Sequence, residues 1–233
     1  MHCNLYAITH FIINNVKRNN IDMPEINNFK KVNSAGQPGP SGLYDPKYEH
    51  DGCGVGFVVN INGTKSHEII ERGIEVMINL LHRGATGGDT KTGDGAGILI
   101  QIPDAFLKHE CNSIGISLPT AGKYGIGMIF LPQEQNPRNK CRQIIEETVV
   151  EEGLEFLGWR EVPVNDTCLG DGARNSQPVI FQCFIEASQQ DILALERKLY
   201  IVRTPIECRI ERKMSPPHPS RIPSMSARTI VYK

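Results

Sequence analysis

The chain has 233 residues, 39% hydrophobic and 22% charged, a composition typical of soluble globular proteins that excludes fibrous and fully disordered chains. Its formal net charge of -1 lacks the positive excess that binding to nucleic acid or an anionic membrane surface requires. No apolar run approaches the roughly 18 to 20 residues that cross a bilayer, so we expect neither nucleic-acid nor membrane partners.

Seven cysteines are scattered along the chain, with no C-x-x-C pair and no Cys/His spacing of the zinc-binding kind. Their odd number and wide spacing indicate free thiols in a reducing compartment, and we expect no metal site. The apolar run at residues 7–13 is short and lacks a small-residue cleavage site, which makes it a poor secretory signal. We therefore expect a cytoplasmic location.

Residues 1–42 are rich in Asn and Lys and end in a stretch of Ser, Gly and Pro, which predicts a leader and linker and no core. We place the first boundary so that residues 1–52 form this leader and residues 53–233 the folded part. A removable pro-segment and a plain N-terminal tail both fit the leader's composition.

One cysteine stands between glycines in residues 49–59, at the start of an apolar stretch that predicts a strand. Alternate side chains of a strand share a face, so Gly54 and Gly56 leave one face nearly bare beside the Cys53 thiol. Two such glycines indicate that another backbone or a ligand approaches closely, although a buried cysteine in a tightly packed strand fits the pattern as well. The opposite face carries Cys53, Val55, Phe57, Val59 and Ile61.

The strand is expected to end at Asn62-Gly63, a pair that favours a two-residue hairpin turn. Ser66 is then a suitable N-cap for a helix, and Gly84 a suitable stop for it. The apolar residues of that helix recur every three or four positions, at Ile70, Ile74, Met77, Ile78 and Leu81.

Residues 82–97 hold six glycines, one arginine and two aspartates, and they precede a strand at 98–102 that looks buried. The stretch is no phosphate-binding P-loop, because it follows a helix, opens a strand and lacks the Gly-Lys pair. A glycine-rich backbone can instead fold closely around a reactive strand end. Arg83 could hold a carbonyl or carboxylate there. Taken alone, its position favours a simpler role, that of a cation at a helix C-terminus that interacts with the helix dipole.

The second half of the chain predicts the order βαββαβ, which resembles a ferredoxin-like sub-unit inserted into or appended to the first segment at about 124–211. We expect Trp159 and Phe181 to supply core and no site. The expected elements are strand 124–131, helix 137–152, strand 154–163, a loop through 170–172, strand 179–187, helix 189–202 and a shorter strand 206–211. Prolines then break the chain, and residues 224–233 look like one final strand.

Three stretches together closely resemble the start of the class II glutamine amidotransferase domain of glutamate synthase large subunits. They are HDGCGVGF at 50–57, HRGA at 82–85 and TGDGAG at 92–97, and SARTIVYK at 226–233 also resembles a family segment. The likeness runs from about residue 42 to residue 233. It implies an α+β fold of the N-terminal-nucleophile type, a four-layer αββα sandwich, present here in incomplete form together with the βαββαβ sub-unit.

The resemblance implies that Cys53 is the nucleophile that hydrolyses L-glutamine to glutamate and ammonia after cleavage between Gly52 and Cys53. An α-amino group has a pKa of about 7.7 to 8.0, so a terminal cysteine would carry its own general base. The implied substrate-binding or site-supporting residues are Arg83, Gly84 and Asp94.

The resemblance implies no cofactor and no metal in this chain. FMN and an iron-sulfur cluster are expected in the synthase domains that this sequence does not contain, where ammonia meets 2-oxoglutarate with electrons from NADPH, NADH or ferredoxin. The family's glutamine-clamping Arg and its Asn-Gly oxyanion pair are likewise expected downstream of the final strand.

The implied partners are therefore L-glutamine and the remaining glutamate synthase domains or subunits. A second interpretation is a catalytically silent remnant that binds or scaffolds those subunits.

Overall fold

The computed structural model of the chain describes residues 54–80, 93, 95–167, 169–186, 191–214 and 220–232. The chain divides into two compact units. The first comprises Met1–Ala96 with Asn165–Gly170, and the second Gly97–Val164 with Asp171–Lys233. None of the described helices combines the length and the apolar character needed to cross a membrane.

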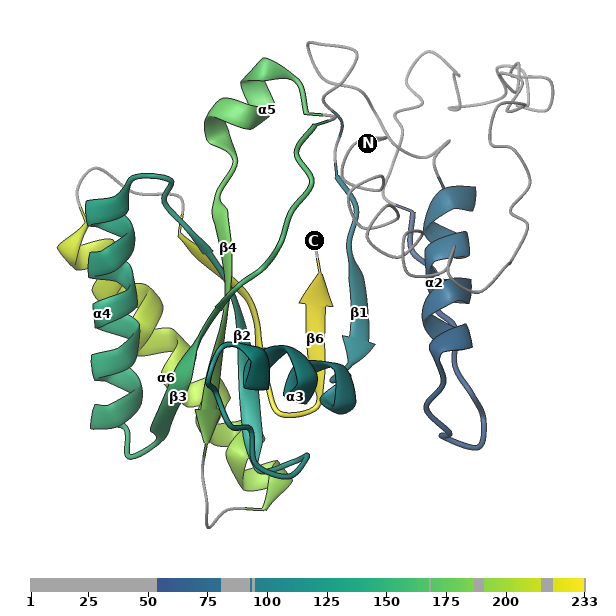
Figure 1. Cartoon of the computed structure of the whole chain (residues 1–233), viewed down its shortest axis with the longest axis horizontal. Coiled ribbons are helices and arrows are strands. Elements are labelled where there is room, and N and C mark those ends of the chain that lie inside the picture. Colours follow the sequence, from purple (N-terminus) through teal and green to yellow (C-terminus); the bar gives the residue numbers. More distant parts are fainter. Residues whose placement is uncertain are drawn as a thin grey trace, which may run out of the picture. The chain divides into compact units, whose positions relative to one another are not determined.

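The main element of the first unit is helix α2 (His67–Asn79), shown in blue in Figure 1. It begins after Ser66, as the sequence predicts, and Ile74 is its most deeply buried residue. The helix ends at Asn79, with Leu80 as C-cap. The expected stop at Gly84 lies outside the described residues.

The prediction of a strand at 53–61 is wrong for the residues that the structure describes, because residues 54–60 form no strand. A strand exists only where a second strand completes its hydrogen bonds, and apolar alternation alone cannot supply that partner. The turn that follows spans residues 60–63, where the Gly63 N–H donates to the Asn60 carbonyl over 2.9 Å. Gly63 takes a φ of 70° at the last position of this turn, and the chain then enters α2 and forms no hairpin.

The second unit contains a four-stranded antiparallel sheet in the order β3-β4-β2-β5. Its elements follow the chain order βαββαβ, as expected, with the short helix α5 added between β3 and β4. They are β2 (Tyr124–Leu131), α4 (Gln135–Glu151), β3 (Glu155–Glu161), α5 (Asp171–Ser176), β4 (Val179–Glu186), α6 (Ile192–Lys213) and β5 (Arg221–Ser226). This strand order is the one that two interleaved, split βαβ units produce.

The strand expected at 206–211 is wrong, because these residues continue helix α6 through Pro205. A proline in a helix interior costs one backbone hydrogen bond, but the buried face of α6 recurs every three or four residues on both sides of it. That face comprises Leu195, Leu199, Val202, Ile206 and Ile210. Tertiary packing therefore extends the helix, and the fourth strand of the sub-unit is β5.

Strand β2 lies at the centre of the second unit and is covered on both faces (Figure 1). Its odd-numbered residues, such as Ile129 and Leu131, pack into a core with α4 and α6. Its even-numbered residues, such as Ile126 and Met128, pack into a second core that includes helix α3 (Asp104–Ser113). The sequence analysis did not anticipate α3.

The second core is also covered by a two-stranded ribbon of β1 (Ile98–Gln101) and β6 (Thr229–Tyr232), which pair antiparallel. The strand predicted at 98–102 therefore exists, but the expectation that it is buried is wrong, since Leu99 is 63% exposed. The single final strand expected at 224–233 is divided, because β5 ends at Ser226 and β6 begins at Thr229.

Helix α4 matches its prediction closely. All five residues expected on its inner face are buried: Cys141, Ile144, Ile145, Thr148 and Val149. Gly153 follows the helix with a φ of 74°, a conformation that glycine adopts at little cost. Trp159 packs against the same core, and Phe181 is buried in it, as expected.

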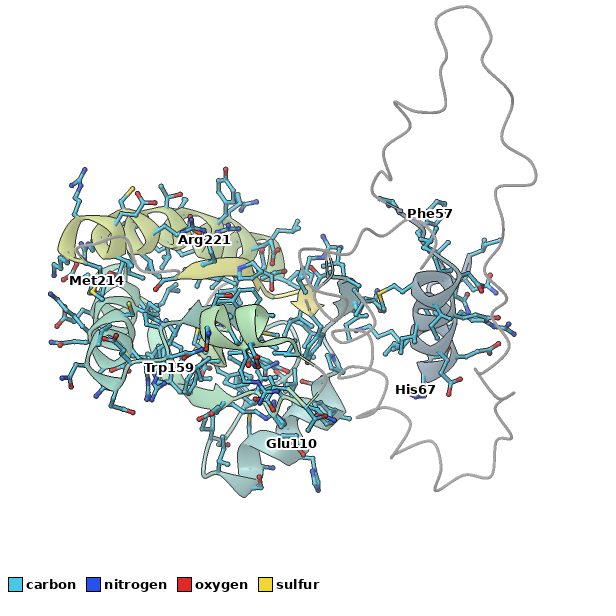
Figure 2. The ribbon with its side chains drawn as sticks, turned by 90° about the horizontal axis from the view of Figure 1, so that it is seen from above. Phe57, His67, Glu110, Trp159, Met214 and Arg221 are labelled. Carbon is cyan, nitrogen blue, oxygen red and sulfur yellow. The ribbon has the colours of Figure 1, made fainter. Side chains whose placement is uncertain are left out.

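A buried polar network joins α3 to the sheet. Arg160 on β3 donates through Nη2 to the Glu110 carboxylate over 2.6 Å and through Nη1 to Gln182 Oε1 over 3.1 Å. This hydrogen bond from Arg160 holds the pKa of Glu110 below its ordinary value of 4.5. Figure 2 shows Glu110 on α3, well apart from Met214 at the end of α6.

We expect Leu199→Ala to destabilise the second unit by about 2 to 5 kcal/mol, because the Leu199 side chain is fully buried between α6 and the sheet. Tyr200→Ala is the matched control on the same helix. Its side chain is 75% exposed, so its effect should stay within about 0.5 kcal/mol. Urea unfolding followed by Trp159, the one tryptophan of the chain, measures both variants. Equal midpoints for the two variants would contradict this packing.

We expect the free energy of unfolding to fall as the pH drops below about 4.5. The folded-state pKa of Glu110 is depressed, so its bond to Arg160 stabilises the fold above the unfolded pKa and is lost as the pH falls through the folded value. Glu110→Gln should lack this component of the pH dependence. Urea unfolding at a series of acidic pH values tests it, and parallel curves for the variant and the wild type would refute it.

Candidate functional site

All four residues that the sequence singles out for the site, Cys53, Arg83, Gly84 and Asp94, lie outside the described residues. The structure instead describes the segments next to them in the chain. Residues 54–60 follow Cys53 directly, and α2 ends shortly before Arg83.

The bare glycine face beside Cys53 packs against helix α2. A Cβ on Gly54 would lie 3.1 Å from Leu80 Cδ2, and a Cβ on Gly56 would overlap with Val76 Cγ1. Side chains of α2 therefore make the close approach at the two glycines, where the sequence analysis expected another backbone or a ligand. Because Leu80 is the C-cap of α2, the segment after Cys53 is held against the end of the helix that leads to Arg83.

The opposite face of the same segment is exposed. The apolar side chains expected to share a face are all solvent-accessible here: Val55 at 89%, Phe57 at 85%, Val59 at 67% and Ile61 at 97%. Figure 2 labels Phe57 in this segment and His67 at the start of α2. The division into a glycine face and an apolar face thus holds even though residues 54–60 form no strand.

The described cysteines are free thiols, as the sequence analysis expects, and three of the four are buried. Burial raises the pKa of Cys111 to about 11 and that of Cys183 to about 12, and it raises the pKa of Cys141 as well. A thiolate is the reactive form, so these three thiols are poor nucleophiles near neutral pH. Cys208 is exposed on α6.

A shallow groove runs along α2 beside residues 58–60. Its arginine, Arg72, already pairs with Glu68 and Glu75, each at 3.5 Å. These carboxylates offset the positive charge that a substrate carboxylate would need, so we assign no ligand to the groove. Within the described ranges, no three His, Cys, Asp or Glu residues gather closely enough to hold a metal ion.

A second polar cluster lies at the corner between β5 and β6, in the SARTIVYK segment that the sequence analysis noted. There the Glu196 carboxylate of α6 accepts hydrogen bonds from Ser226 and Ala227. The sequence analysis did not single out Glu196. A single glutamate on a helix gives no local signal, and its partners lie about 30 residues further along the chain.

The family model of the class-II glutamine amidotransferases matches residues 53–233. The chain belongs to this family. The match begins at Cys53, the residue that the sequence analysis names as the nucleophile.

Three relatives show the same relationship. The chain is 42% identical over 198 residues to the NADPH glutamate synthase large chain of Bacillus subtilis, covering 84% of this chain and 13% of the relative. It is 45% identical over 150 residues to the NADH glutamate synthase of Saccharomyces cerevisiae, covering 62% and 7%. It is 39% identical over 188 residues to the ferredoxin-dependent glutamate synthase 2 of Synechocystis, covering 79% and 12%.

The resemblance to glutamate synthase large subunits is therefore confirmed. The chain spans 13% or less of the length of these three relatives.

We expect Gly56→Ala to loosen the packing of residues 54–60 on α2 by about 1 kcal/mol, because the new methyl group would overlap with the stiff Val76 side chain. Hydrogen exchange of the α2 amides should accelerate. Adding Val76→Ala removes the obstructing methyl groups, so the double variant should exchange like Val76→Ala alone. Unchanged exchange in Gly56→Ala would show that the glycine face does not pack on α2.

Proposed function

We propose that this chain carries the glutaminase site of a glutamate synthase and hydrolyses the side-chain amide of L-glutamine with Cys53 as the nucleophile. The observation that carries the proposal is that the family match starts at Cys53, within the HDGCGVGF stretch. Hydrolysis of the peptide bond between Gly52 and Cys53 releases the leader, residues 1–52, and makes Cys53 the terminus of the mature chain.

The bonds and protons of the reaction balance with the terminal residue, the substrate and water. The freed α-amino group, with a pKa near neutrality, takes the proton from the thiol. The thiolate attacks the side-chain carbonyl carbon of glutamine, the carbon–nitrogen bond breaks, and ammonia leaves with a proton returned by the amino group. Water then hydrolyses the glutamyl thioester, which releases glutamate and restores the thiol.

The packing of α2 supports a place for Arg83 beside this thiol. Leu80 contacts Gly54, the residue after Cys53, and Arg83 follows Leu80 closely in the chain. We propose that Arg83 acts near the nucleophile, where its planar donors would suit a carbonyl or carboxylate. Gly84 and Asp94 belong to the glycine-rich stretch that we propose closes around the same site.

The wider fold that we propose is the αββα sandwich of the N-terminal-nucleophile proteins. Two features of the second unit support it: α4 and α6 cover one face of the four-stranded sheet, and the β1–β6 ribbon packs on the other. The βαββαβ sub-unit from β2 to β5 lies between β1 and β6 in the chain, as an insertion would.

The ammonia released at Cys53 would serve the remaining glutamate synthase domains, which we propose as the partners of this chain. The names of the relatives include NADPH, NADH and ferredoxin. In our proposal FMN and an iron-sulfur cluster sit in those partner domains, where ammonia and 2-oxoglutarate form L-glutamate. We assign no cofactor to the described residues of this chain.

Incubation of the full chain with an electrophilic diazoketone analogue of glutamine, followed by peptide mapping, tests the proposal. We expect one adduct, on a Cys53 that has become N-terminal, with protection by L-glutamine and none by D-glutamine. Cys53→Ser should abolish the adduct, and the exposed Cys208 serves as the internal control thiol. An intact leader without any adduct would refute the proposal and favour a silent scaffold.

A further inference from the structure

The β1–β6 ribbon of the second unit carries apolar side chains on both of its faces. On the inner face, Ile100 and Ile230 pack into the core that includes α3. On the outer face, Leu99 is 63% exposed and lies opposite Val231. Where both faces of a strand are apolar, the hydrophobic pattern specifies its pairing register only weakly.

A shift of the pairing by two residues would keep the inner face apolar. In the observed register Ile100 lies opposite Ile230. After such a shift, Ile102 would lie opposite Ile230, and Ile100 opposite Tyr232. All four side chains already belong to the same core, so apolar burial alone does not choose between the two registers.

Polar contacts at the corner between β5 and β6 do distinguish them. Glu196 on α6 accepts a hydrogen bond from Ser226 Oγ and another from the Ala227 N–H, both over 2.7 Å. Ser226 Oγ in turn accepts from the N–H groups of Arg228, over 3.0 Å, and Thr229, over 3.1 Å. Three successive backbone N–H groups are therefore held, directly or through Ser226, by Glu196.

The corner is tied to β1 by one further backbone bond. The Arg228 carbonyl accepts from the Ile102 N–H over 3.0 Å, just beyond the end of β1. In a ribbon shifted by two residues, Ile102 would lie opposite Ile230, and this bond could not form. The fixed corner therefore favours the observed register.

The other end of β6 has polar contacts of its own. Gln182 Nε2 on β4 donates to the Tyr232 hydroxyl over 3.2 Å, and Gln182 Oε1 accepts from the buried Arg160. The Val231 N–H donates to Ser224 Oγ over 3.2 Å. A shift of β6 along the ribbon would separate these donors from their acceptors.

Hydrogen bonds of this kind specify position in a way that apolar packing does not. Bonds from N–H and O–H groups to a carboxylate are strong and directional, whereas hydrophobic packing is non-directional. Setting a register is also the best-attested role of polar groups within apolar interfaces. In the SARTIVYK segment, Ser226 and Tyr232 are the side chains that contact Glu196 and Gln182.

We propose that Glu196 sets the register of β6 against β1, with Gln182 as a second anchor at the other end of the strand. The SARTIVYK segment thus carries, in Ser226 and Tyr232, the side chains that fix its own pairing. Without the carboxylate of Glu196, registers shifted by two residues become populated while the second unit stays folded.

The test measures the register by disulfide formation between introduced cysteines in the full chain. Leu99→Cys with Val231→Cys reports the observed register, because these residues lie directly opposite each other. Gln101→Cys with Val231→Cys, and Leu99→Cys with Thr229→Cys, report shifts in the two directions. In the observed register these last two pairs are diagonal neighbours, about 7 to 8 Å apart and too distant for an unstrained disulfide.

Each pair is equilibrated in a glutathione redox buffer, and peptide mapping identifies the crosslink between the introduced cysteines. The measured quantity is the effective concentration of the opposite pair divided by that of each diagonal pair. The backgrounds are wild type, Glu196→Leu, Ser226→Ala and Tyr232→Phe. Urea unfolding confirms that each background is folded at the temperature of the measurement.

The matched control background is Arg209→Gln. Arg209 also bridges from α6, but toward α4, to Glu151 over 2.6 Å and Thr148 over 3.1 Å. Its loss removes a polar contact of the same helix without touching the corner.

We expect Glu196→Leu to lower the ratio for at least one diagonal pair by about 10- to 100-fold, the factor that the loss of hydrogen bonds to a charged group produces. Ser226→Ala should lower it in the same direction. Tyr232→Phe should lower it by less than about tenfold, because its hydrogen bond joins neutral groups. Arg209→Gln should leave it at the wild-type value.

Equal ratios in Glu196→Leu and Arg209→Gln would overturn the proposal, since apolar packing alone would then fix the register. If Glu196→Leu fails to fold, Ser226→Ala decides in the same way. A wild-type chain in which a diagonal pair crosslinks as readily as the opposite pair would also overturn it.

Discussion

The burial of β2 on both faces is the constraint on which the second unit depends. Seven of its eight residues are buried, and they alternate between two cores. A strand of this kind needs two covering layers, and the chain supplies α4 and α6 for one face and α3 with the β1–β6 ribbon for the other. The βαββαβ topology delivers the helices to one side, which leaves the opposite side for the segments that flank the sub-unit in sequence.

The division of the second unit into a helix-covered face and a ribbon-covered face bears on function. Strand β1 directly follows the glycine-rich stretch, and β6 lies within the SARTIVYK segment. Both stretches resemble the glutamate synthase amidotransferase domain. The sub-unit contacts the SARTIVYK segment through directional hydrogen bonds, because Gln182 donates to Tyr232 and Glu196 accepts from Ser226. Arg160 in turn donates to Gln182.

Periodicity in the sequence was sufficient to predict the elements with a strong apolar pattern. The inner face of α4 and the spans of β2 and β4 follow directly from it. The pattern failed where tertiary context decides: the sequence analysis ended the helix at residue 202 and expected a strand at 206–211, yet packing carries α6 through Pro205 to Lys213. The first half of β5, with Arg221 and Pro223, was not predicted as a strand, but β5 lies at a sheet edge, where proline is tolerated.

The residues of the candidate site were predicted from motifs and not from apolar periodicity. Cys53, Arg83, Gly84 and Asp94 came from motifs, and the family match confirms the family but tests none of these roles. The glycine pair indicated a close approach, but the neighbours are the side chains of Val76 and Leu80 and not the backbone or ligand that the sequence analysis expected. The hydrogen bonds of Glu196 could not be predicted from sequence, because its partners lie about 30 residues further along the chain.

The central claim is that Cys53 acts as a chain terminus that supplies its own base. The most direct measurement compares the rate at which the diazoketone analogue of glutamine alkylates a chain beginning at Cys53 with the rate for a chain that retains Gly52. The account predicts that the terminal form reacts faster by about 10²- to 10⁴-fold, the usual contribution of a positioned general base. Equal rates would contradict it, since the amide of Gly52-Cys53 has no basicity to offer.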